Sequence, residues 1–310
     1  MDIMIFGGTG FIGNALAERL CNEGHQVDVL SRKARVSHAG GPNYLVGDLI
    51  AGAYPSLSVY DVIINCAGEI NNQELMRSLH VDALSNVLES LPSHCKTRWI
   101  EMSSVGVYGP IHGGVVRESN EFNPVGMYEE TKAEAEIMVR EVCKVKGIDY
   151  TIIRPSNVFG EGMPNRSLAQ LLTMVKKGLF FYIGNPDSYV MNYVHVQDVV
   201  EITIKSIEQP QARNQDFIIS DSISQREFVK VIKEELGGKR IVQVPKMLVK
   251  LLSRCGNLIP HFPLTGSRVS ALTLKSFYSV EKAEKLLGYT PSVGIEAGLR
   301  NYCRHLKSSM

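Results

Sequence analysis

Two hydrophobic patterns alternate along the first half of the chain. Short apolar runs rich in Val and Ile are followed by longer segments in which apolar residues recur at helical spacing. The short runs predict strands at residues 2–6, 26–30, 44–46, 61–67, 98–104 and 150–155. The longer segments predict helices near residues 11–24, 71–92 and 126–147. Because such runs suit strands buried on both faces, the alternation predicts an α/β fold with a Rossmann-type, doubly wound parallel sheet.

The pattern changes after about residue 160. Turn clusters appear, and the spacing of apolar residues predicts helices near residues 165–178, 224–236 and 244–254, with one strand at 216–220. We expect residues 1–160 to form a dinucleotide-binding domain, with further pieces of its sheet and helices within 192–222. Residues 161–310 are expected to form a smaller, mostly helical substrate-binding domain. In open α/β sheets ligands bind at the carboxyl edge, so the site is expected there.

Charge and hydropathy exclude two classes of partner. The chain has 310 residues, with 33 Lys and Arg against 32 Asp and Glu. This balance leaves no overall field to attract nucleic acid or a membrane surface. The most membrane-like segment, residues 246–264, is interrupted by Lys250, Arg254 and prolines, so it is too polar to span a bilayer. We expect an amphipathic helix over a substrate cleft in this segment.

The cysteines indicate a reducing compartment. They are scattered, without a CxxC pair or a His at metal-ligand spacing, at Cys21, Cys66, Cys95, Cys143, Cys255 and Cys303. Such a distribution argues against a disulfide framework and against a zinc site. The N-terminus begins with a predicted strand instead of a signal peptide. A cytoplasmic protein without a metal site is therefore expected.

Three glycines mark a tight turn after the first predicted strand. Gly7, Gly10 and Gly13 stand at three-residue intervals between that strand and an amphipathic helix. The first permits the turn, the second lets a pyrophosphate approach the backbone, and the third lets the helix pack on the strand. The pattern predicts a dinucleotide site at the start of the helix.

The second predicted strand ends in residues that suit a phosphate. In NAD-selective proteins of this fold, an acidic residue about twenty positions after the glycines holds the ribose hydroxyls. Here that position is Ser31, followed by Arg32, and the nearby carboxylate of Asp28 lies back inside the strand. A hydroxyl and a guanidinium favour a ribose 2′-phosphate. We expect NADP, with NAD as the alternative; Arg32 is the main candidate, and Lys33 and Arg35 are weaker ones.

A tyrosine and a lysine form a candidate proton-transfer pair. Tyr128 and Lys132 are four residues apart, so they share one face of the predicted helix. A nearby ammonium stabilises a phenolate and lowers the pKa of the phenol, which suits proton transfer to or from a carbonyl or alcohol oxygen. Ser104, on the loop after a predicted strand, can donate a hydrogen bond to the same oxygen.

These motifs occur in the order typical of one enzyme family. Over nearly the whole chain stand, in turn, GGTGFIG, VGDL, CAG, SSVGVYG, the YxxxK pair, RPSNVFG, NYVHVQDVV and SVEKAEKLLGYTP. In this the sequence resembles the extended short-chain dehydrogenase/reductases, which act with NAD or NADP, mostly on sugars linked to nucleoside diphosphates. The resemblance implies that Tyr128 is the catalytic acid/base, that Lys132 lowers its pKa and holds the nicotinamide ribose, and that Ser104, preferred to Ser103, polarises the substrate oxygen.

The resemblance also implies further binding residues. Asp48 and Leu49 would contact the adenine, and Pro155 would lie beside the nicotinamide. Asn157 and Arg268 would face a nucleotide-sugar substrate. The complete set of expected cofactor contacts is Gly7, Thr9, Gly10, Phe11, Ile12, Gly13, Ser31, Arg32, Asp48, Leu49, Cys66, Ala67, Gly68, Tyr128, Lys132 and Pro155.

The residues after Ser104 help to distinguish the possible reactions. Dehydratases of this family place an Asp–Glu pair there, and combined epimerase–reductases place a cysteine two residues on; this chain has Val105 and Gly106. Simple hydride chemistry at one carbon remains, either reduction of a 4-keto sugar or 4-epimerisation. Relatives that epimerise usually carry the acidic, NAD-type strand end. The Ser31/Arg32 pair therefore favours an NADP-dependent reductase, with an NAD-dependent 4-epimerase as the alternative.

Two further functions stay open. Where the family often has an arginine that clamps a diphosphate, this chain has Met191. An NADPH reductase of a small apolar ketone or aldehyde is therefore an alternative. A non-catalytic cofactor-binding protein would lack the serine, tyrosine or lysine, and all are present. By resemblance a homodimer is expected, formed through the helices near 71–92 and 126–147.

Overall fold

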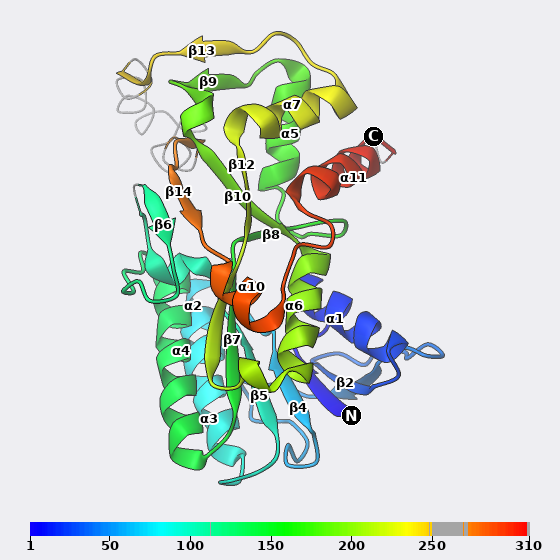
Figure 1. Ribbon diagram of the computed structural model, residues 1–310. Coiled ribbons are helices and arrows are strands. Elements are labelled where there is room, and N and C mark those ends of the chain that lie inside the picture. Colours follow the sequence, from blue (N-terminus) through cyan, green and yellow to red (C-terminus); the bar gives the residue numbers. More distant parts are fainter. Residues whose placement is uncertain (112, 248, 250–268, 270–271, 309–310) are drawn as a thin grey trace.

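A seven-stranded parallel sheet lies at the centre of the fold (Figure 1). The computed structural model describes residues 1–111, 113–247, 249, 269 and 272–308. The strand order is β11-β7-β5-β4-β1-β2-β3, and each neighbouring pair is parallel. The strands are β1 (Asp2–Phe6), β2 (Gln26–Ser31), β3 (Asn43–Val46), β4 (Val62–Asn65), β5 (Arg98–Met102), β7 (Tyr150–Pro155) and β11 (Gln215–Ile219).

Helices cover both faces of this sheet. Helices α1 (Phe11–Asn22) and α6 (Val196–Glu208) lie on one face, and α3 (Ala83–Ser90) and α4 (Met127–Lys146) lie on the other (Figure 1). Strand β1 shows why both faces are apolar: Ile3 and Ile5 pack toward α1, whereas Met4 and Phe6 pack toward α3 and α4. The prediction of a doubly wound, Rossmann-type sheet is confirmed.

The segment expected as one helix at 71–92 is divided into three parts. A short helix α2 (Gln73–Arg77) is followed by a π-helical turn η1 (Ser78–Asp82) and then by α3. The wider π turn contains His80, which is buried and hydrogen-bonded to two groups outside the turn. Insertions of this kind are frequent at functional sites. Here the turn lies beside the start of α4.

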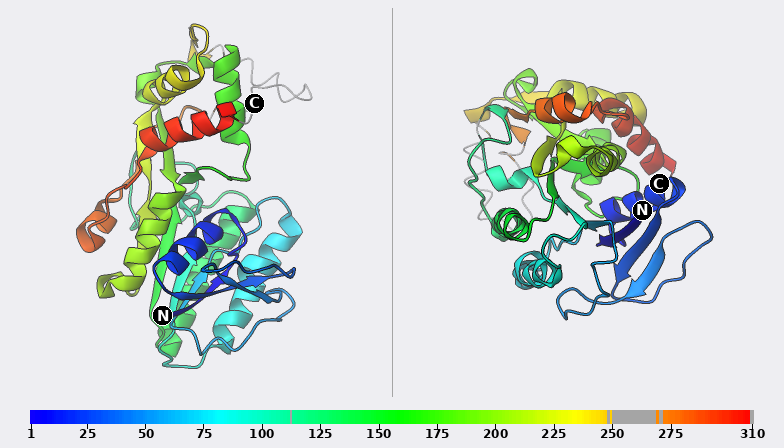
Figure 2. Two further views of the ribbon diagram at one scale, coloured as in Figure 1. Left: turned by 90° about the vertical axis from the view of Figure 1, so that its right-hand side faces the viewer. Right: turned by 60° about the horizontal axis from the view of Figure 1, so that its bottom comes forward.

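A second group of elements stands above the carboxyl edge of the sheet (Figures 1 and 2). Its own apolar core is built mainly from helices α5 (Ser167–Lys177), α7 (Gln225–Leu236) and α11 (Ile295–Ser308). Its strands are β8 (Asn157–Phe159), β10 (Val190–His195), β12 (Asp221–Ser224), β9 (Phe181–Ile183) and β13 (Val242–Val244), with β6 (Gly114–Val116) and β14 (Ser276–Tyr278) paired alongside.

The chain passes between the two groups more than once. Helix α6 and strand β11 return to the large sheet, and helix α10 (Glu281–Leu287) packs Ala283 and Leu287 into the core beside α1 and α6. The division into domains at residue 160 stays a prediction. Helix α6 lies within residues 192–222, where the sequence analysis expects further pieces of sheet and helix without giving their bounds. Most of the helix expected at 244–254 lies outside the described residues.

Among the helices in the described part of the chain, none is long and apolar enough to cross a membrane.

Candidate cofactor pocket and catalytic residues

A pocket opens at the carboxyl ends of strands β1 to β4. Its walls are Gly7, Thr9, Gly10, Leu30, Ser31, Arg32, Gly47, Asp48, Leu49, Ile50, Cys66, Ala67, Gly68, Glu69, Leu75 and Leu79. Most predicted cofactor contacts thus line one pocket, although they come from four separate loops. The predicted contacts outside these walls are Phe11, Ile12, Gly13, Tyr128, Lys132 and Pro155. The sequence reasoning missed Leu30, Gly47, Ile50, Glu69, Leu75 and Leu79.

Adjacency could have identified some of the missed residues. Leu30, Gly47, Ile50 and Glu69 each adjoin a predicted contact in the chain. Leu75 and Leu79 instead reach the pocket from α2 and the π turn. No local sequence signal marks that helix–turn segment as a pocket wall.

The glycine turn leaves no room for side chains. A Cβ atom on Gly7 would lie 2.5 Å from the Cys66 carbonyl oxygen and 2.6 Å from the Ala67 nitrogen, and Gly7 has a positive φ of 71°. A Cβ atom on Gly13 would collide with the Gly7 carbonyl oxygen. On Gly10 the contact is milder, at 3.2 Å from the Gly7 oxygen. Gly10 lines the pocket, so its missing side chain leaves space for a ligand.

The start of α1 is suited to an anion. Gly10 is the N-cap residue, no side chain caps the helix, and no acidic residue stands in its first turn. The first N–H groups of a helix have no intrahelical partner and carry the positive end of its dipole. Together with the glycine turn, these features fit the pyrophosphate of a dinucleotide.

The residues at the end of β2 that were predicted to bind a phosphate make different contacts. The Ser31 hydroxyl is buried and donates to the Lys33 carbonyl at 2.7 Å, so it closes the turn after the strand. Arg32 follows and lines the pocket. The Arg35 guanidinium lies over the Tyr44 ring, 5.9 Å from its centroid. Arg32 is therefore the basic residue of this stretch that faces the pocket.

Asp28 is held away from that pocket. Its carboxylate accepts hydrogen bonds from the Tyr60 hydroxyl at 2.7 Å and from the Asn43 amide at 2.9 Å. Asp28 is not among the pocket walls. The strand end therefore presents a cation to the pocket, as the sequence suggests.

Glu69 brings a negative charge to the same pocket. Its carboxylate accepts three backbone N–H groups, from Asn71 at 2.7 Å, Ile70 at 2.9 Å and Asn72 at 3.1 Å. Hydrogen bonds to the charged form favour it. These bonds, led by the one from Asn71, lower the pKa of the Glu69 carboxyl, with a smaller contribution from Arg32. The pocket thus contains one cation and one stabilised anion.

Asp48 combines a turn with a place in the pocket wall. Its Oδ1 accepts the Ile50 N–H at 2.9 Å, and its backbone pairs with Ala53 in both directions. The carboxylate therefore shapes a tight turn after β3. That turn carries Asp48 and Leu49 into the wall of the pocket.

The candidate catalytic side chains come from β5 and α4. Ser104 follows β5 and caps the short helix η2 (Val105–Tyr108), with its Oγ accepting the Gly106 N–H at 3.1 Å. Among the described residues its O–H donates to no protein group, so it can donate to a ligand. Tyr128 and Lys132 lie in the first turns of α4. Tyr128 is half-buried, and within the described ranges its phenolic oxygen has no hydrogen-bond partner.

The Lys132 side chain is buried against strand β5. Its side chain is 5% exposed, and its ammonium donates to the Met102 carbonyl at 2.7 Å. The Glu101 carboxylate lies 3.6 Å from the same nitrogen. An ammonium has three N–H donors, so a further donor can reach a ligand.

His80, which the sequence analysis did not select, borders Tyr128. The Thr131 hydroxyl donates to carbonyls of its own helix, so His80 Nδ1 donates to Thr131 at 2.8 Å. His80 Nε2 then accepts the Glu69 N–H at 2.9 Å. Burial, together with the Lys132 ammonium, lowers the pKa of His80 to about 3. The imidazole is therefore neutral at physiological pH.

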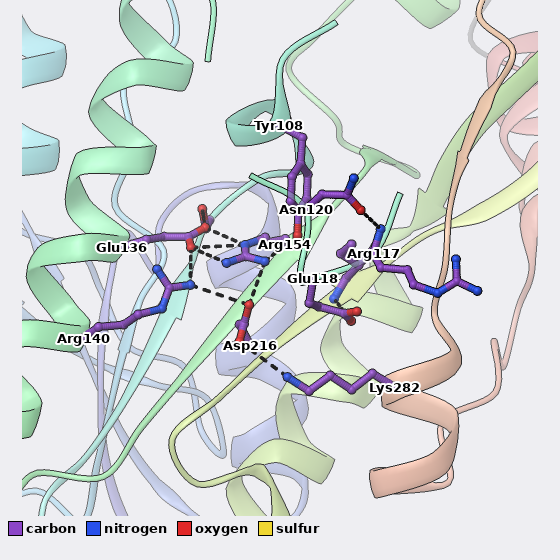
Figure 3. Close-up of polar contacts among 11 residues, drawn as sticks. Tyr108, Arg117, Glu118, Asn120, Glu136, Arg140, Arg154, Asp216 and Lys282 are labelled. Carbon is purple, nitrogen blue, oxygen red and sulfur yellow. Dashed lines mark hydrogen bonds and ion pairs between the residues drawn. The ribbon is translucent and has the colours of Figure 1, made fainter. Parts of the chain in front are cut away.

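A buried polar network fixes α4 against the sheet (Figure 3). The Arg154 guanidinium on β7 binds the Glu136 carboxylate on α4, with Nε–Oε1 and Nη2–Oε2 distances of 2.9 and 2.7 Å. It also lies 2.8 Å from Asp216 on β11 and donates to the Tyr108 hydroxyl. Ser103 donates to Glu136 and is buried. Ser103 is thus engaged in this network, whereas the Ser104 hydroxyl accepts the Gly106 N–H.

The predicted substrate residues are only partly described. Asn157, on β8, is exposed, and its amide donates to the Asn192 carbonyl at 3.0 Å. Met191 is buried in the core of the upper group. Pro155 ends β7 at the carboxyl edge. Arg268 lies outside the described residues.

Comparison with known proteins places this site in a family context. The family model described as "NAD dependent epimerase/dehydratase family" matches residues 3–220. The chain is 25% identical over 313 residues to UDP-glucose 4-epimerase of Vibrio cholerae, covering 96% of this chain and 93% of that protein. It is 30% identical over 257 residues to 3beta-hydroxysteroid-dehydrogenase/decarboxylase isoform 1 of Arabidopsis thaliana, covering 74% of this chain and 58% of that protein.

Solved structures share the fold. UDP-glucuronic acid 4-epimerase from Bacillus cereus in complex with NAD superposes with a TM-score of 0.75 and 18% identity, covering 99% of this chain and 97% of that chain. UDP-glucose 4-epimerase from Thermotoga maritima with UDP-glucose gives a TM-score of 0.71 and 20% identity, covering 100% and 99%.

Proposed function

The chain belongs to the NAD dependent epimerase/dehydratase family, whose members are NAD(P)-dependent enzymes of the extended short-chain dehydrogenase/reductase type, and we propose that it is an NADP-dependent oxidoreductase. The proposed reaction is hydride transfer to a keto carbon, C4, of a nucleotide-linked sugar. The observation that carries the choice of cofactor is Arg32, which lines the pocket at the end of β2 where NAD-selective relatives have a carboxylate.

The residues at the start of α4 would handle the proton. A bound nicotinamide cofactor would supply a hydride for the carbonyl carbon, and the C=O π electrons would move to the oxygen. Tyr128 donates its phenolic proton to that oxygen, giving an alcohol and a phenolate. The Lys132 ammonium stabilises the phenolate, and the Ser104 O–H orients and polarises the carbonyl. Solvent then returns the proton to Tyr128.

The residues of the pocket are the support for proposing a dinucleotide with a 2′-phosphate. Gly10 at the start of α1 would leave room for the pyrophosphate, while Gly7 and Gly13 keep the turn tight because a Cβ at either would collide with the backbone. Arg32 would hold a 2′-phosphate with its planar fork of donors. Asp48 and Leu49 would form the adenine side of the pocket.

A second candidate is an NAD-dependent 4-epimerase, and Glu69 is the observation that favours it. Its ionised carboxylate lines the same pocket as Arg32 and would oppose a 2′-phosphate. The curated relative from Vibrio cholerae is named UDP-glucose 4-epimerase, and solved neighbours contain NAD. An epimerase would keep its cofactor bound and return the hydride to the opposite face of C4.

The substrate part of the proposal rests on the upper group of elements. Asn157 presents an exposed side chain at the carboxyl edge of the sheet, and solved neighbours contain UDP-glucose or UDP-glucuronic acid. The Arabidopsis relative is instead named for a steroid substrate. We therefore keep a small apolar ketone as the competing substrate.

We extend the proposal to a homodimer formed through α2 and α4. Leu75 on α2 also lines the cofactor pocket, so the exposed apolar side chains of α4, Met127 at 37% and Ile137 at 48%, support the proposal. Sedimentation of the wild type and of Ile137→Glu tests this: a dimer that the substitution converts to a monomer supports it, and a wild-type monomer contradicts it.

Cofactor identity is the first test. Nucleotide released from the denatured protein is identified, and the emptied protein is titrated with NADPH and NADH. We expect exchangeable NADPH binding that Arg32→Ala weakens by roughly 10-fold or more, with NADH binding little changed. Lys33→Ala is the matched control: it removes the same charge one residue away, outside the pocket walls.

Other outcomes separate the candidates. Stoichiometric NAD that stays bound would identify the 4-epimerase. Equal losses in Arg32→Ala and Lys33→Ala would mean that the basic stretch acts only through its general charge. Thermal stabilisation of the cofactor-bound protein by UDP or a UDP-sugar supports a nucleotide-sugar substrate, whereas turnover of a lipophilic ketone without such stabilisation supports the apolar one.

A further inference from the structure

Strand β5 carries a buried carboxylate that the proposed reaction does not use. Glu101 is 1% exposed and lies on the side of β5 that faces α4. Trp99, two residues earlier, packs in the core beneath α3 and α4, and Ser103, two residues later, binds Glu136 on α4. Side chains two apart on a strand share a face, so Glu101 belongs to the row that meets the catalytic helix.

Among the described residues, every group that bonds to or pairs with this carboxylate is a donor. The Asn65 amide nitrogen lies 3.2 and 2.9 Å from its two oxygens, and the Trp99 indole nitrogen lies 3.0 Å from Oε2. The Lys132 ammonium completes the group at 3.6 Å from Oε1. A protonated carboxyl group would need an acceptor for its own hydrogen, and among the described residues none is bonded to it. The donor-only surroundings therefore favour the ionised carboxylate.

Lys132 is the cation that faces Glu101. Burial raises the pKa of the Glu101 carboxyl, and the Lys132 ammonium, followed by Asn65 and Trp99, opposes that rise. The other titratable groups nearby contribute no free charge. Burial raises the pKa values of the Cys66 and Cys143 thiols to about 12, so both are neutral.

The remaining neighbours are paired or neutral. Glu136 on α4 is bound by the Arg154 and Arg140 guanidiniums. His80 is neutral, as described above. Glu101 and Lys132 are therefore the facing pair of opposite charges at this buried site.

Glu101 also reaches the cofactor pocket through Asn65. Because the Asn65 amide nitrogen donates to the carboxylate, its Oδ1 faces the loop after β4 and accepts the Ala67 N–H at 3.2 Å. Ala67 is a wall of the pocket. One carboxylate thus orients both the lysine of α4 and the loop after β4.

We propose that Glu101 is a positioning residue, the buried counter-ion that holds the Lys132 ammonium under β5 and sets the net charge that Tyr128 meets. The inference rests on the proton-transfer roles proposed for Tyr128 and Lys132, and it holds for NADP or NAD. In this arrangement the carboxylate offsets part of the ammonium's field at the phenol. Tyr128 therefore releases its proton less readily than it would beside an uncompensated lysine.

Removing the negative charge of Glu101 should make the neighbouring acids more acidic. In Glu101→Gln the neighbouring acids lose their proton more easily, because no carboxylate stabilises the protonated forms. Tyr128 shares the face of α4 that carries Lys132, so its phenolate can replace the lost counter-ion beside the buried ammonium. Phenolate absorbance should therefore appear at a lower pH in the variant than in the wild type.

The test measures that pKa without a substrate. Phenolate absorbance is titrated in protein bound to whichever cofactor it takes, and the same titration of Tyr128→Phe is subtracted. Glu101→Gln should lower the Tyr128 pKa, and Glu101→Asp, which keeps the charge, should return it toward the wild-type value. Trp99→Phe is the matched control: it disturbs the same buried site and keeps the charge, so it should reduce stability without moving the Tyr128 pKa.

An unchanged or raised Tyr128 pKa in Glu101→Gln would overturn the inference. Should that variant not fold, carbon NMR of the wild-type Glu101 carboxyl, assigned by its loss in Glu101→Asp, decides: an ionised group at neutral pH supports the counter-ion, and a protonated one refutes it. Failure of the wild type to bind either cofactor would contradict the proposed function instead, and it is read from the cofactor titration.

Discussion

The imidazole of His80 meets the ring of Tyr128 edge to face, with ring centroids 5.7 Å apart and planes at 82°. The contact joins the π turn before α3 to the first turn of α4. Both nitrogens of His80 are engaged, by Thr131 and by the Glu69 N–H. His80 therefore packs against the proposed catalytic tyrosine as a neutral ring and does not exchange protons with it.

That neutrality predicts a pH dependence of stability. The pKa of His80 is lowered from 6.5 to about 3 in the folded protein. Between these values the unfolded chain binds the proton and the folded chain does not, so stability is complete above the unfolded pKa and falls as the pH drops. From about pH 7.5 to about pH 5 this costs about 2 kcal/mol of unfolding free energy.

Urea unfolding of the wild type and of His80→Gln at both pH values measures this. The loss of unfolding free energy from about pH 7.5 to about pH 5 should be smaller in His80→Gln than in the wild type, by about 2 kcal/mol. A variant with the wild-type pH dependence would show that His80 is charged in the folded protein.

Two tyrosines should separate chemistry from stability. Tyr128→Phe removes a hydroxyl with no partner in the described part of the chain, so the fold should be kept while kcat falls by about 100-fold or more. Tyr108→Phe removes the acceptor of a buried Arg154 N–H, so it should lower the unfolding free energy by about 1–3 kcal/mol. Hydride transfer that survives in Tyr128→Phe would show that another group is the acid.

The glycine turn predicts a difference between two Gly→Ala variants. Gly7 and Gly24 have positive φ values of 71° and 85°, so alanine at either costs about 1–2 kcal/mol. A Cβ at Gly7 also meets the backbone of Cys66 and Ala67, whereas at Gly24 nothing lies within 4 Å. Denaturant titration should show the larger loss in Gly7→Ala, with cofactor binding lost as well. Equal losses would indicate that the loop after β4 moves aside freely.

The Arg154–Glu136 pair predicts a large effect of one buried substitution. Arg154→Met leaves the Glu136 carboxylate buried without its bidentate partner, which should cost about 3–5 kcal/mol of unfolding free energy. The exposed Arg226–Asp187 pair has similar bidentate geometry, at 2.6 and 3.0 Å. Arg226→Met should therefore unfold like the wild type. Similar losses of unfolding free energy in Arg154→Met and Arg226→Met would show that burial does not decide how much such a pair stabilises the fold.

Several parts of the site could be predicted from local patterns. The alternation of apolar strands and amphipathic helices predicted the sheet, and the spacing of Gly7, Gly10 and Gly13 predicted its first turn. The spacing of Tyr128 and Lys132 placed both on one helical face. Such signals depend on neighbours within a few residues, where backbone geometry alone fixes the arrangement.

Tertiary packing decided the rest. Glu101 reads as one polar residue in a strand, and its contact with Lys132, 31 positions later, exists because α4 crosses that face of β5. His80 gains its role from a π turn inside a segment that the sequence predicts as a single helix, and Glu69 gains its role from the loop before that segment. Burial and charge pairing between distant elements depend on how the faces meet in three dimensions, which no local pattern specifies. The sequence by itself determined the sheet, the glycine turn and the serine, tyrosine and lysine; the fold decided which charges surround them.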